Sequence, residues 1–185
     1  GDWSSDVCSS DLERLDKRIF GYTRVFERSY YDALADWCMR RYGWTFERKE
    51  LVMSNGIIPA LYELVEYICQ PDEKVLFMTP SYAYFKYAAD FNKREYVCSD
   101  LKNDEGRYSI DFEDFAKKAA DGKTTLFILC NPHNPSGRVW TEEELRKMAD
   151  IIEKNQMWVI SDEIHCDLLR RNQKHIPMGK AMPDY

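Results

Sequence analysis

Two loops of this 185-residue chain carry the residue types that could do chemistry. The first runs from Asn131 to Gly137 and presents the amide of Asn134 between two prolines. The second follows the apolar pair Val159 and Ile160 and presents the carboxylate of Asp162. The two polar residues are 28 positions apart (162 − 134 = 28), with one helix-length segment between them. Both are therefore expected to reach one ligand at the carboxyl edge of a parallel sheet.

A third candidate site surrounds Gly56. Residues 51–53 are predicted to form a short buried strand, and Pro59 suits the first turn of a helix that continues to residue 68. A helix start offers unpaired N–H groups and the positive end of the helix dipole, which together bind anions. Gly56, Ile57 and Ile58 are therefore predicted to hold an anionic group through their backbone.

The elements that must position these residues follow from the spacing of apolar side chains. Helical spacing predicts further helices at residues 29–42, 82–91, 112–120 and 141–155. Apolar runs predict further strands at residues 75–78, 95–98, 125–130 and 157–160. Strands that alternate with helices of this length indicate a three-layer α/β fold, with a mostly parallel sheet flanked by helices.

The predicted helix ends come from capping residues. Ser29 with Asp32, and Thr141 with Glu144, have capping-box spacing, and Gly43 is a stop signal. Asp111 is the expected cap of the helix that follows it.

Composition excludes several function classes. The chain has 26 basic and 32 acidic residues, and a net charge of −6 attracts neither nucleic acid nor an anionic membrane. No apolar stretch approaches the ~18 residues of a spanning helix, and no signal peptide is recognisable. The six cysteines form no CxxC pair, which indicates a cytoplasmic protein without disulfides.

Taken together, the motifs resemble those of fold-type I pyridoxal 5'-phosphate (PLP) enzymes of the aminotransferase class I/II superfamily. Within it the chain is most similar to the MalY/PatB-type carbon–sulfur β-lyases, the cystathionine β-lyases. The matching segments are residues 20–23, 55–62, 79–82, 131–137, 161–165 and 175–177. The resemblance extends from Arg14 to the end and implies the large domain of the PLP-dependent transferase fold, truncated.

The resemblance also implies roles for single residues. Asp162 would pair with the protonated ring nitrogen of PLP, and Asn134 would bind the ring hydroxylate. Tyr82 would stack on the ring, while the Gly56–Ile58 backbone would bind the phosphate. Tyr22 matches a tyrosine that reaches the cofactor phosphate of the neighbouring subunit, which implies a homodimer.

His165 distinguishes the subfamilies. Most aminotransferases of this fold have tyrosine three residues after the aspartate, whereas the lyase branch has the Ser-Asp-Glu-Ile-His order found here. The implied reaction is β-elimination on cystathionine or another cysteine conjugate, giving a thiol, pyruvate and ammonia. Two alternatives stay open: a class I/II aminotransferase, and a non-catalytic PLP-binding effector domain of a transcription regulator, which would follow a winged-helix domain.

The expected domain organisation is that of an N-terminal fragment. Residues 1–12 have the character of a non-native scar, residues 13–50 form an N-terminal segment and helix, and residues 51–185 form part of the PLP-binding large domain. The family's Schiff-base lysine, substrate-binding arginine and C-terminal domain are expected beyond Tyr185. No catalytic residue is therefore assigned within the chain, and the fragment is expected to be inactive.

Two rival interpretations of the same residues are weaker. Residues 159–163 could be a Walker B strand, and residues 122–124 imitate the end of a P-loop, but position 117 is Lys where a P-loop needs Gly. A metal site could be drawn from the cysteines, histidines and aspartate at the strand ends: Cys130, His133, Asp162, His165 and Cys166. No pair of these has a recognised ligand spacing, so no metal is predicted.

Overall fold

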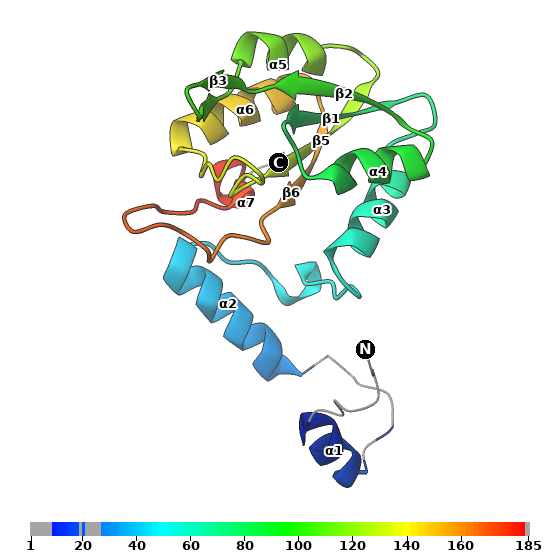
Figure 1. Ribbon diagram of the computed structural model, residues 1–185, viewed down its shortest axis with the longest axis vertical. Coiled ribbons are helices and arrows are strands. Elements are labelled where there is room, and N and C mark those ends of the chain that lie inside the picture. Colours follow the sequence, from blue (N-terminus) through cyan, green and yellow to red (C-terminus); the bar gives the residue numbers. More distant parts are fainter. Residues whose placement is uncertain (1–8, 19, 21–26, 184–185) are drawn as a thin grey trace, which may run out of the picture.

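A parallel sheet of four strands forms the centre of the computed structural model, which describes residues 9–18, 20 and 27–183 (Figure 1). The strands are β1 (Lys74–Thr79), β2 (Glu95–Asp100), β5 (Thr124–Cys130) and β6 (Trp158–Asp162). Their order is β2-β1-β5-β6, and every neighbouring pair is parallel. The register places Cys130 beside Asp162, so the ends of β5 and β6 meet at one edge.

Helices cover both faces of this sheet. On one face lie α3 (Ile57–Ile68) and α4 (Ala83–Phe91), and on the other α5 (Phe112–Ala119) and α6 (Glu142–Lys154) (Figure 1). Side chains alternate along a strand, so Val75 and Phe77 of β1 pack in the first core while Leu76 and Met78 pack in the second. The predicted three-layer α/β fold is confirmed.

Smaller elements complete the described chain. They are α1 (Ser9–Asp16), α2 (Arg28–Tyr42), the 3₁₀ turn η1 (Arg48–Glu50), the antiparallel hairpin of β3 (Lys102–Asp104) and β4 (Arg107–Ser109), and α7 (Met178–Ala181). The helix α2 lies apart from the sheet, and the segment after β6 passes over its C-terminal end (Figure 1). None of the helices in the described residues is long and apolar enough to cross a membrane.

Capping chemistry explains some of the helix boundaries. Thr141 and Glu144 form the predicted capping box of α6, and the Asp111 side chain accepts from the Asp114 amide at the start of α5. Gly43 ends α2 at φ 61°. The Ser29 prediction was wrong: α2 begins at Arg28 after Glu27, without a side-chain cap.

The strand predicted at residues 51–53 is absent, and this segment is irregular. Val52 is 82% exposed, so this segment is not the buried strand that was predicted. At the N-terminus, α1 begins at Ser9 and crosses the boundary expected after residue 12. The hairpin of β3 and β4 was not predicted, although Gly106 at φ 85° marks its turn.

Candidate cofactor site

A cavity of about 430 Å³ opens at the carboxyl edge of the sheet. Seven of the eight predicted site residues line it: Gly56, Ile57, Ile58, Tyr82, Asn134, Asp162 and His165. The eighth, Tyr22, lies outside the described residues. Residues up to 109 positions apart in the chain (165 − 56 = 109) are thus brought to one hollow.

The ends of three parallel strands explain this convergence. Tyr82 follows β1 and is the N-cap residue of α4, Asn134 lies in the loop after β5, and Asp162 is the last residue of β6. Because β1, β5 and β6 are adjacent and run the same way, their carboxyl ends lie at one edge.

Asp162 is a partly desolvated carboxylate in this cavity. Burial raises its pKa, while the Ile164 amide, which donates to Oδ1 at 3.2 Å, and the nearby His165 lower it. No salt bridge to Asp162 is found in the part of the chain that the structure describes. A positive group in the cavity would therefore stabilise the ionised form.

The loop that carries Asn134 is held by its own residues. The Cys130 thiol donates to the Pro132 carbonyl, and the backbone N–H of Asn134 donates to Cys130 Sγ, both at 3.3 Å. Burial raises the pKa of Cys130 to about 11, so the thiol is protonated at neutral pH. His133 Nδ1 lies 2.7 Å from Ser136 Oγ. The backbone around Asn134 is thereby fixed before any ligand binds.

The start of α3 supplies backbone donors to the same cavity. Gly56, the N-cap residue, has φ 125°, a conformation that residues with a Cβ rarely adopt. The amides of Ile57 and Ile58 lie in the first turn and lack a helical acceptor, and Pro59 has no N–H. This geometry suits an anionic group at the helix N-terminus.

Three residues that line the cavity were not predicted: Pro59, Cys130 and Ile164. Ile164 lies between Asp162 and His165 and is 58% exposed. The available signal in the sequence was an apolar residue between the predicted site residues Asp162 and His165, since such a side chain can form an apolar wall for a ligand.

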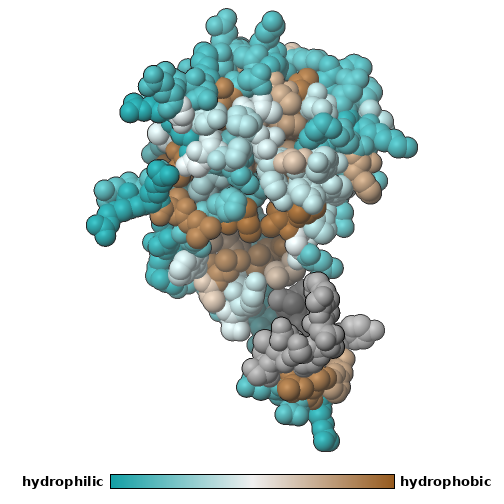
Figure 2. All heavy atoms as spheres, viewed as in Figure 1, coloured by the Kyte–Doolittle hydropathy of each residue, from teal (hydrophilic) through white to brown (hydrophobic). Residues whose placement is uncertain are grey.

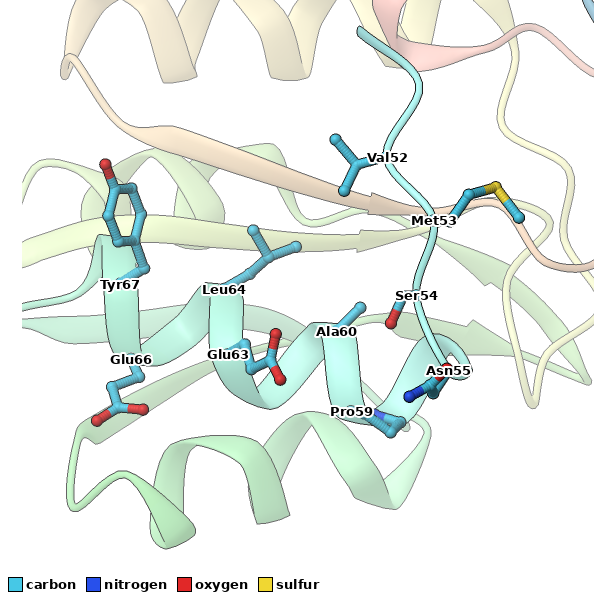
Figure 3. A pocket seen from close by; sticks show the side chains of 10 residues that line it. All are labelled: Val52, Met53, Ser54, Asn55, Pro59, Ala60, Glu63, Leu64, Glu66 and Tyr67. Atoms are coloured by element: carbon cyan, nitrogen blue, oxygen red, sulfur yellow. The ribbon is translucent and has the colours of Figure 1, made fainter. Parts of the chain in front are cut away.

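A larger hollow of about 800 Å³ lies between residues 52–55 and α3 (Figure 3). Its charged groups are Glu63 and Glu66, and both are anionic. It contains none of the seven cavity residues named above, and two carboxylates disfavour a phosphate. We therefore assign the ligand site to the smaller cavity.

The smaller cavity combines a half-buried carboxylate, a tyrosine ring and unpaired amides at a helix start. These groups complement a flat ligand with a positive ring atom and an anionic substituent. Among the described residues, no cluster of three or more His, Cys, Asp or Glu side chains could hold a metal ion.

Comparison with known proteins places this arrangement in a family. The sequence profile of the aminotransferase class I and II family matches residues 10–183, and the chain belongs to that family. Cystathionine beta-lyase PatB of Bacillus subtilis is 39% identical over 173 residues, which are 94% of this chain and 44% of PatB. Protein MalY of Escherichia coli is 32% identical over 91% of this chain and 43% of MalY.

A solved structure agrees with these relatives. The PLP-bound C-S lyase from Staphylococcus hominis is 52% identical, with a TM-score of 0.91 over 94% of this chain and 44% of that one. The chain thus spans about half the length of the proteins it matches.

Proposed function

We propose that this chain is the cofactor-binding N-terminal part of a PLP-dependent carbon–sulfur β-lyase. Its substrate would be an L-cysteine thioether such as cystathionine, and its products a thiol, pyruvate and ammonia. The observation that carries the proposal is the convergence of Asp162, Asn134, Tyr82, His165 and the start of α3 on one cavity. The lyases among the similar proteins support the choice of reaction.

The cavity residues fit PLP in charge and shape. Asp162 has a raised pKa and no salt bridge in the described chain, so a protonated ring nitrogen would complete the pair. The α3 start would hold the phosphate, Asn134 and His165 would hold the ring hydroxylate, and Tyr82 would cover a ring face. When bound, PLP supplies an electron sink for bond breaking at the substrate α-carbon.

We propose further that the longer protein is a homodimer, as the resemblance at Tyr22 implies. Exposed apolar side chains on and before α3 support a covered surface there, since Val52, Ile57 and Tyr67 are all more than half exposed. A cytoplasmic location is supported by the five free cysteines of the described residues, because reducing compartments keep thiols free.

The test is a side-by-side assay of the full-length protein with L-cystathionine. We expect pyruvate release to be faster than transfer of the amino group to a keto acid. Amino transfer without pyruvate would instead support the aminotransferase, which is the second candidate because it shares every proposed cofactor contact. PLP binding with neither activity would support a non-catalytic effector domain.

The residue that favours the lyase is His165, and its variants sharpen the assay. An imidazole can donate or accept a proton near neutral pH, whereas a tyrosine hydroxyl stays protonated. His165→Tyr is expected to lower the ratio of pyruvate release to amino transfer. His165→Asn, which also lacks the acid–base chemistry but does not add the volume of a tyrosine ring, is the control for the larger side chain.

A further inference from the structure

We infer that Glu163 is a positioning residue, which sets the direction in which Asp162 enters the cavity. The inference deepens the proposed function and rests on it, since Asp162 matters in this way only if it holds the ring nitrogen of PLP. Glu163 is the next residue in the chain and does not line the cofactor cavity.

The Glu163 carboxylate is held by donors from two separate segments. Oε1 accepts from Ser161 Oγ and from the Met178 amide, both at 2.8 Å. Oε2 lies 2.7 Å from His175 Nε2. A carboxylate with both oxygens engaged has a fixed orientation, so the backbone at residue 163 can rotate little.

The burial of His175 lowers the stability of the folded protein. Its side chain is fully buried, and Nδ1 has no hydrogen-bond partner within the described residues. An unpaired polar atom in the interior destabilises the folded state. The ring is held against Tyr42 of α2, with ring centres 5.2 Å apart at 81°. A buried polar pair that tolerates this cost points to a requirement for a defined geometry.

The neighbouring strand is attached to the same segment, residues 175–178. The side chain of Asn131, just after β5, donates to the Ile176 carbonyl at 3.2 Å. The backbone N–H of Asn131 also donates to the Asp162 carbonyl at 3.0 Å. Residues 175–178 therefore brace the two strand ends from which Asn134 and Asp162 extend into the cavity.

The geometry of Asp162 then depends on both of its sides. Its carbonyl is held by Asn131 and its carboxylate by the Ile164 amide, while Glu163 lies between Asp162 and Ile164 in the chain. Loss of the Glu163 contacts would free the 163–164 backbone and loosen the Asp162 carboxylate. A small misplacement of a residue that meets a ligand by one hydrogen bond is costly.

The experiment is a double-mutant cycle in the full-length protein, measured as PLP dissociation constants and as melting temperatures of the cofactor-free protein. Glu163→Gln keeps the side-chain volume and should weaken PLP binding about tenfold, the lower end for residues that orient a ligand-binding group. In the Asp162→Asn background, Glu163→Gln should change the dissociation constant less than twofold, because there is no ring-nitrogen contact left to position.

A matched control separates positioning from general destabilisation. Asp114 is also a half-buried carboxylate with two side-chain partners, Ser99 and Lys118, but it lies on α5 away from the cavity. Asp114→Asn should lower the melting temperature and leave PLP affinity unchanged. If Glu163→Gln does not fold, His175→Phe removes the donor to Glu163 Oε2 while keeping a ring against Tyr42, and it enters the same cycle.

The outcomes distinguish the two hypotheses. Equal effects of Glu163→Gln in both backgrounds, or an unchanged dissociation constant, would overturn the positioning role and leave the proposed function intact. An Asp162→Asn protein that binds PLP as tightly as the wild type would overturn the assignment of Asp162, and the inference with it.

Discussion

The helices on the two faces of the sheet differ in the side chains that they expose. On one face α6 buries Leu145, Met148 and Ile152 and turns charged residues to water, with the Arg146–Glu142 pair on its surface. On the other face α3 buries Leu61 and Val65 but leaves Leu64 41% and Tyr67 85% exposed. In Figure 3 Leu64 points toward the hollow below residues 52–55. The outer side of α6 is charged, whereas α3 carries apolar side chains both toward the sheet and on its outer side.

The difference coincides with the position of the site. Gly56 to Pro59 at the start of α3 line the cofactor cavity, and no residue of α5 or α6 does. Figure 2 shows a band of hydrophobic residues across the face where, in Figure 1, β6 ends and α3 begins. The α6 side is thus built for stability, whereas the α3 side combines the site with surface that further structure can cover.

The largest expected effect is on the cavity side. In the full-length protein, Asp162→Ala should lower turnover by about 100-fold or more, because a preorganised charge partner is lost. Burial raises the pKa of Asp162, so its ionised form opposes folding at neutral pH. The cofactor-free variant should therefore melt no lower than the wild type. Near-normal turnover would show that another carboxylate has this role.

Core truncation tests the comparison of the helices directly. Leu145→Ala in α6 removes a fully buried side chain and should lower the free energy of unfolding by about 2–5 kcal/mol. Leu64→Ala in α3 should cost less than about 1 kcal/mol in this chain, because Leu64 is partly exposed. Urea unfolding followed by circular dichroism measures both. Equal losses would mean that α3 is packed as completely as α6.

The loop of residues 131–137, which follows β5, should make the free energy of unfolding depend on pH. Burial lowers the pKa of His133 to about 4, below the ~6.5 of an unfolded histidine. The unfolded state therefore binds more protons between these values, so stability is full above pH 6.5 and falls as pH drops toward 4. The contribution is on the order of 3 kcal/mol. His133→Asn should flatten unfolding free energy against pH in this window, and an unchanged slope would contradict the burial effect.

The smallest effect concerns helix ends. Thr141→Ala removes the hydroxyl that accepts from the Glu144 amide at 3.1 Å and should cost about 1 kcal/mol. Ser29→Ala, at the position where a cap was predicted but not formed, should change stability by less than about 0.5 kcal/mol. The pair is compared by thermal melts of this chain; a Ser29 effect as large as that of Thr141 would restore the predicted cap.

Predictions from local patterns succeeded where short-range physics decides the structure. The apolar run of residues 125–130 is a buried strand, and Asp111 and Thr141 cap helices as expected. The run at residues 51–53 failed, because three apolar residues form a strand only beside a partner strand. The hairpin of β3 and β4 was missed because its strands are short and polar.

The sequence by itself determined the order of the elements, the cavity-edge positions of Asn134 and Asp162, and the family to which those motifs belong. These features depend on periodicity and on loops that follow strands, which neighbouring residues encode. Only the tertiary structure decided that Glu163 meets His175, that Asn131 is bound to Ile176, and that Tyr42 packs on the His175 ring. Such contacts depend on how separate segments pack in three dimensions, and residue spacing does not encode that packing.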